Sequence, residues 1–118
     1  MTKITFFKKN GIYYGFQETG HTGYADEGAD ILCSALSAMT MLIINAIEVS
    51  YASDVHYTID DTTTNITVTC KDAFTEFSKD DKKSYAVSGL FQAYYIQLVD
   101  MLEDYYEYLD VDEIEKEV

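Results

Sequence analysis

The sequence has few basic side chains, only two cysteines and two histidines, and no proline. Eight basic residues stand against 21 acidic ones, which gives a formal net charge of −13 over 118 residues. This balance argues against direct binding of RNA or of an anionic membrane, because lysine and arginine make the contacts to phosphate. It suits a basic peptide or protein as partner, although a high net charge also serves plain solubility.

Cys33 and Cys70 are too few and too far apart to form a disulfide framework. We see no signal peptide and no apolar run near the roughly 20 residues that a membrane helix needs. We therefore expect a protein of the reducing cytoplasm with no membrane contact. The length, with 47% hydrophobic residues, predicts one globular domain over residues 1–118.

The first half of the chain predicts a hairpin followed by a helix. Residues 2–8 and 12–18 are rich in β-forming side chains, and Asn10-Gly11 between them is a strong hairpin signal. From Ile31 to Ile47 the apolar residues recur every three or four positions, which is typical of a helix packed on a core.

The second half repeats this order. Residues 55–60 and 66–70 alternate apolar and polar side chains, which predicts a hairpin with one buried face and with Cys70 as a buried, inert thiol. A polar linker over residues 71–83 leads to a long helix through residues 87–105. Residues 100–118 carry nine acidic side chains, which we interpret as a solvated helix end or frayed tail rather than a surface for a basic partner. The prediction is an α+β two-layer sandwich in ββαββα order, with an antiparallel sheet of about four strands and two helices.

The stretch from Gly20 to Ser37 has the composition of a reactive site. Three glycines (Gly20, Gly23 and Gly28) predict hinges or close backbone approaches in a loop that can open and close. If Asp30 caps a helix that begins at Ile31, Cys33 is its third residue and its pKa is lowered by the positive helix end. The amides of that turn would hold an oxyanion, and His21 would reach the sulfur as general base and acid.

Two residues of this stretch have alternative roles. Asp30 is either the helix cap or the group that orients His21, and its carboxylate opposes thiolate formation if it lies near the sulfur. Ser37 lies one turn after Cys33 and either donates a hydrogen bond within the site or bonds back to a helix carbonyl.

The stretch resembles the bacterial ribosomal-processing cysteine proteases called Prp, or YsxB-like proteins. Their signature, Gly-His-x-Gly-Tyr-Ala, then a short acidic spacer and Gly-x-Asp-Ile-x-Cys-x-Ala-x-Ser, is present here from Gly20 to Ser37 with its spacing intact. The resemblance implies a cytoplasmic, homodimeric endopeptidase without a cofactor, with His21 and Cys33 as the catalytic pair. It also implies the substrate, the N-terminal extension of large ribosomal subunit protein twenty-seven, cut after a hydrophobic, aromatic-rich segment.

Two other functions remain open from the residues themselves. The two histidines and two cysteines (His21, His56, Cys33 and Cys70) would make a metal-ligand set, but no pair has the short spacing of a structural zinc site, so we predict no metal. A non-catalytic ribosome-assembly module is the other alternative, in which the acidic surface holds a basic ribosomal protein and Cys33 is incidental.

Overall fold

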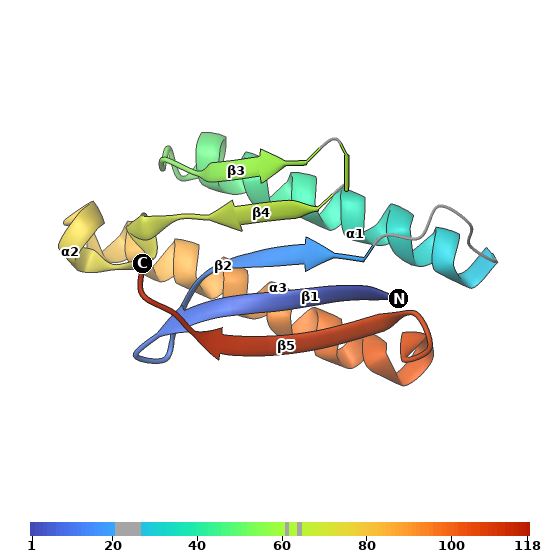
Figure 1. The fold of residues 1–118 in the computed structure, drawn as a ribbon. Coiled ribbons are helices and arrows are strands. Elements are labelled where there is room, and N and C mark those ends of the chain that lie inside the picture. Colours follow the sequence, from blue (N-terminus) through green and yellow to red (C-terminus); the bar gives the residue numbers. More distant parts are fainter. Residues whose placement is uncertain (21–26, 61, 64) are drawn as a thin grey trace.

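The computed structural model shows one sheet covered on one face by helices (Figure 1). It describes residues 1–20, 27–60, 62–63 and 65–118. The five strands stand in the order β3-β4-β2-β1-β5, with the helices α1 and α3 behind them in Figure 1. The predicted two-layer α+β arrangement is confirmed, but the sheet is mixed and has one strand more than predicted, because β5 runs parallel to β1.

The central hairpin joins β1 (Thr2–Lys9) to β2 (Ile12–Thr19) as predicted. Asn10 and Gly11 both have positive φ, 52° and 78°, which is the backbone that a tight two-residue turn requires. Phe6 and Phe16 point from this hairpin toward the helices and are fully buried. The hairpin therefore supplies the centre of the core.

The two long helices close the core. α1 (Glu27–Asn45) continues into the π-helix η1 (Ala46–Ser50), and α3 spans Asp81–Tyr105. Contrary to our expectation, the helical stretch Asp30–Ser50 has the length and composition of a membrane span. Core helices of folded domains pass the same test, and Leu32, Leu36 and Ile47 of this stretch are buried in the core.

The acidic end of the chain is only partly what we interpreted it to be. Residues 100–105 are the end of α3, as interpreted, but residues 109–115 form a strand rather than a frayed tail. β5 (Leu109–Glu115) pairs with β1 along its whole length, with Thr2 opposite Leu109 and Lys8 opposite Glu115. Leu109 is buried and Val111 half-buried, so the segment alternates apolar and acidic residues. We did not predict a strand here because we interpreted the many acidic residues as a sign of a solvated segment.

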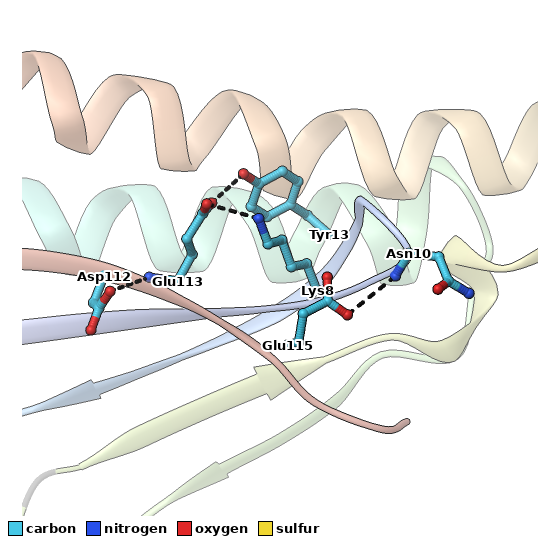
Figure 2. Close-up of polar contacts among 6 residues, drawn as sticks. All are labelled: Lys8, Asn10, Tyr13, Asp112, Glu113 and Glu115. Carbon is cyan, nitrogen blue, oxygen red and sulfur yellow. Dashed lines mark hydrogen bonds and ion pairs between the residues drawn. The ribbon is translucent and has the colours of Figure 1, made fainter.

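A polar cluster fastens β5 to the hairpin (Figure 2). Glu113 accepts hydrogen bonds from the Tyr13 hydroxyl and from Lys8 Nζ, the second at 2.8 Å. The Tyr13 ring stacks on Tyr95 of α3, with 5.4 Å between the ring centroids. Glu115 accepts a bond of 3.3 Å from the Asn10 amide. Acidic side chains of β5 thus hold the edge of the sheet together.

The second hairpin, β3 (His56–Ile59) with β4 (Ile66–Thr69), forms as predicted. Its buried face is confined to β4, where Val68 is buried, whereas all four residues of β3 are exposed because β3 is an edge strand. Cys70 is buried, as predicted.

The predicted linker over residues 71–83 is more ordered than expected. It contains a 3-10 turn, η2 (Lys71–Ala73), a short helix α2 (Thr75–Ser78) and the start of α3. The Asp80 carboxylate caps α3 by accepting hydrogen bonds from the amides of Lys82 and Lys83. The signal was present in the sequence, since aspartate followed by a helical pattern is a strong N-cap.

Candidate active site

Cys33 lies on the second turn of α1, at the end of the sheet where β2 finishes. Because α1 begins at Glu27, Cys33 is its seventh residue and not its third, as we had predicted. We had placed the start after Gly28 because glycine usually marks a loop, but Gly28 lies in the first turn, where a helix tolerates it at a cost of about 1 kcal/mol. Gly28 is therefore not a loop hinge.

The position of Cys33 one turn further into α1 than predicted changes the chemistry available to its sulfur. The amides without helical partners belong to the first four residues of a helix, so the Cys33 amide is bonded inside α1. The helix start lies about 9 Å of rise away from Cys33. The predicted oxyanion hole from first-turn amides at Cys33, and the predicted lowering of its pKa by the helix end, are therefore both wrong.

The surroundings of Cys33 raise its pKa. The half-buried position of the thiol is the main cause, followed by the negative charges of Glu18 on β2 and Asp30 on α1, while the amino group of Met1 acts in the opposite direction. Among the described groups, the Met1 amino group therefore lowers the pKa of Cys33 by less than burial and the two acids raise it. These described surroundings favour the protonated thiol over the thiolate at Cys33.

Asp30 is not the cap of α1, because it is the fourth residue of the helix. Its side chain is exposed, and its charge opposes thiolate formation at Cys33, as its proximity to the sulfur predicted. Ser37, one turn further along α1, is also exposed. Both side chains are therefore more exposed than the half-buried Cys33.

Gly20 is a close-approach position, as predicted. Its φ is 83°, and a Cβ atom built there would lie 2.4 Å from the backbone oxygen of Met1. Only glycine fits where the end of β2 passes the start of β1. His21 and Gly23 fall outside the described residues, so their predicted roles stay predictions.

Sequence reasoning missed Glu18. This residue is 1% exposed and lies on the core side of β2, two positions after Phe16 and opposite Ile4. A usable signal was present, because an acid stood at an inward-facing position of an alternating strand, where an apolar residue is expected.

A cavity of about 440 Å³ opens on the other face of the sheet, away from Cys33. Its lining includes Thr67 and Thr69, which flank the core residue Val68 on β4, together with Phe7, His56 and Lys116. Within the described ranges no cluster of three histidine, cysteine or acidic side chains has the arrangement of a metal site. His56 and Cys33 lie on opposite sides of the sheet, which separates two members of the metal-ligand set we considered.

Known structures share the fold of this chain. The chain superimposes on SMU.848 from Streptococcus mutans with a TM-score of 0.77 at 26% identity, covering 98% of this chain and 96% of that one. It superimposes equally well on the ribosomal processing protease Prp from S. aureus in complex with a substrate peptide, with a TM-score of 0.77 at 17% identity, covering 97% of this chain and all of the other. The same S. aureus protease with a covalently linked product peptide gives a TM-score of 0.75 at 18% identity, with 97% and 100% coverage.

Comparison with the curated protein sequences finds no match. The family model for the cysteine protease Prp, in contrast, matches residues 1–110, which is nearly the whole chain. The chain therefore belongs to the cysteine protease Prp family, and it is a cysteine protease.

Proposed function

We propose that this chain is a processing endopeptidase that removes the N-terminal extension of large ribosomal subunit protein twenty-seven in the cytoplasm. The family match over residues 1–110 carries the proposal, because it includes the whole motif from Gly20 to Ser37. The fold shared with the S. aureus ribosomal processing protease, which was solved with a substrate peptide, supports it.

In the proposed reaction Cys33 is the nucleophile and His21 is the general base and acid. His21 accepts the proton from the Cys33 thiol. The sulfur then attacks the carbonyl carbon of the aromatic residue after which the peptide is cut. His21 then gives its proton to the departing amine, which leaves a thioester on Cys33. Water, deprotonated by His21, hydrolyses the thioester and restores the thiol.

The raised pKa of Cys33 fits an enzyme that is inactive until its site is complete. Burial and the charges of Glu18 and Asp30 favour the protonated thiol. A protonated His21 next to the sulfur offsets these effects, and enclosure of the substrate strengthens that ion pair by excluding water. Such a site spares other cytoplasmic proteins from stray cleavage.

The charge of the chain suits the proposed substrate. A net charge of −13 attracts a basic ribosomal protein and repels RNA. On β5, Asp110 and Asp112 are exposed at the edge of the sheet. This acidity also supports the second candidate function, a non-catalytic module that binds a ribosomal protein, and the raised pKa of Cys33 is consistent with that candidate too.

The proposed enzyme is a homodimer. Large apolar side chains are exposed on both helices: Met41, Leu42 and Val49 on α1–η1, and Ile96 and Val99 on α3. Val49 is 74% and Leu42 is 63% exposed. Such side chains favour burial against another surface. Sedimentation of Leu42→Asp against the parent tests this, and equal dimer fractions for the two would contradict it.

The first experiment is cleavage of the extended ribosomal protein by the parent, by Cys33→Ala and by His21→Ala, followed by mass spectrometry. We expect the parent to cut once, after an aromatic residue, and both variants to fail while staying folded. Cys70→Ala is the matched control, because its thiol lies in the core beside β4. If no protein cuts and all bind the ribosomal protein equally, the binding module replaces the protease.

A further inference from the structure

The cavity of about 440 Å³ lies on the face of the sheet that is turned away from α1 and α3 (Figure 1). His56 on β3 lies opposite Thr69 on β4, and the same row of pairs continues across β2 to Phe7 on β1. Residues that lie opposite each other in an antiparallel pair point to the same face of a sheet. His56, Thr69 and Phe7 therefore line the cavity together, although they come from three different strands.

A β-bulge directs Tyr14 into the floor of this cavity. The pairing of β1 with β2 shifts between Phe7 and Lys8, and Tyr14 is the residue of β2 that is left without a partner on β1. A bulge re-aims the side chain of its extra residue. The Tyr14 ring packs against Phe7 and Phe74, with 6.1 and 5.5 Å between the ring centroids. Tyr14 and Phe7 are 3% and 4% exposed, so the floor of the cavity is aromatic and closely packed.

The segment of residues 116–118 forms one wall of the cavity. The Tyr14 hydroxyl is shared between the backbone oxygens of Lys116 and Glu117, at 2.8 and 3.2 Å. The Lys116 amide donates a hydrogen bond of 3.0 Å to a backbone oxygen of β1, and Lys116 Nζ lies 4.6 Å from the centroid of the Phe7 ring. These contacts place the ammonium group of Lys116 beside the aromatic floor.

The cavity gathers positive charge and hydrogen-bond donors in a chain whose net charge is −13. Its lining contains two lysines, one histidine and two hydroxyl side chains: Lys71, Lys116, His56, Thr67 and Thr69. The ion pairs between described side chains use other lysines, both on β1. The ammonium groups of Lys71 and Lys116 are therefore available to a negatively charged ligand.

The two acids of the lining do not cancel this positive charge. Glu117 forms an ion pair of 3.0 Å with Lys9, which is not part of the lining, and the Glu117 side chain is 84% exposed to water. Its charge is thus largely offset and screened. Asp54 is the other acid, and it is also exposed. Two lysines therefore face one aspartate across the cavity.

We propose that this cavity is a binding site for a small organic anion, a carboxylate or phosphate carried on an apolar body. The apolar body lies on the side chains of Tyr14 and Val55, and Lys71 and Lys116 bind the anionic group with help from the two threonines. The volume suits a small molecule, because ligand pockets usually measure about 300–1,000 Å³. This inference goes beyond the proposed function and does not rest on it, since Cys33 lies on the other face of the sheet.

The test titrates the full chain with three probes of similar shape, followed by NMR: phenylacetate, phenyl phosphate and the cation phenethylamine. We expect at least one anion to bind with a Kd of about 1 mM or tighter and to shift the signals of Thr69 and His56. The tighter of the two anions identifies the anionic group. Preference for phenethylamine, or no binding of either anion up to about 10 mM, would overturn the proposal.

Variants locate the bound anion. Lys71→Met and Lys116→Met should each weaken its binding at least about fivefold, because each removes one charged partner but keeps an apolar side chain. Lys82→Met is the matched control, since Lys82 is exposed on α3 and lies outside the lining. If Lys116→Met does not fold, Lys71→Met alone carries this comparison. Unchanged binding in Lys71→Met, or loss of binding in Cys33→Ala, would show that the anion binds elsewhere and would overturn the proposal.

Discussion

Replacing Glu113 by glutamine tests whether the acidic strand β5 is held by its charge. Glu113 accepts hydrogen bonds from Tyr13 and from Lys8, and these bonds lower its pKa, the bond from Lys8 being the larger cause. Its side chain is 30% exposed, so water screens the interaction. A hydrogen bond to a charged acceptor contributes about 1.5–3 kcal/mol when well buried. Because solvent screening weakens this interaction, we expect Glu113→Gln to lower the free energy of unfolding by about 1 kcal/mol at pH 7.

The pH dependence provides the sharper form of this prediction. A carboxylate with a lowered pKa stabilises the folded protein above its unfolded pKa of about 4.3, and this contribution is lost as the pH falls through the folded value. The stability difference between the parent and Glu113→Gln, measured by urea unfolding, should therefore shrink between about pH 5 and pH 3.

Glu115→Gln is the control, because Glu115 is exposed and accepts a long bond of 3.3 Å from the Asn10 amide, whereas Glu113 accepts from two side chains. Glu115→Gln should lower the free energy of unfolding by much less than Glu113→Gln does. If Glu113→Gln costs as much at pH 3 as at pH 7, or if both variants cost the same, charge does not hold β5 in place and apolar contacts of Leu109 and Val111 do.

Three further changes test other parts of the structure. Gly20→Ala should destabilise the protein by about 1 kcal/mol or more in thermal unfolding, because its φ of 83° and the Met1 oxygen leave no room for a methyl group, and an unchanged melting temperature would contradict this geometry. Asp80→Ala should cost about 1 kcal/mol by removing the cap of α3, whereas Asp81→Ala next to it should cost less. Burial raises the pKa of Cys70 to about 11, so at pH 8 mass spectrometry should find iodoacetamide on Cys33 well before Cys70, and the reverse order would show that Cys70 is not enclosed.

Periodicity in the sequence was enough to predict the hairpins and both long helices. Asn10-Gly11 predicted the first turn. The three-and-four spacing from Ile31 to Ile47 predicted the helix and its core residues Leu32, Leu36, Ile43 and Ile47, but Ile31 and Leu42 of the same pattern are exposed. β5 was missed because its acids suggested a solvated tail, although Leu109 and Val111 alternate with them. The partner of β5 could not be read locally, since β1 lies more than a hundred residues earlier.

At the site, the motif singled out Cys33, but the charged groups around its thiol could not be predicted from the sequence. The pKa of Cys33 depends on where α1 begins and on Glu18, which comes from a different element. Helix starts are poorly determined by pattern alone, and a glycine in the first turn misplaced this one by a turn. Local patterns predict which residues carry the chemistry, whereas tertiary contacts determine their protonation.

The parallel pairing of β1 with β5 also determines when the sheet can be completed during synthesis of the chain. Phe6 lies opposite Glu113, so a central strand keeps an open edge until almost the whole chain has left the ribosome. Contacts between such distant residues form slowly, because a long loop must close first. Gly20 also needs the backbone of Met1 fixed beside it, and that depends on a settled β1. The sheet of the nascent chain is therefore complete only after nearly all of the chain has been synthesised.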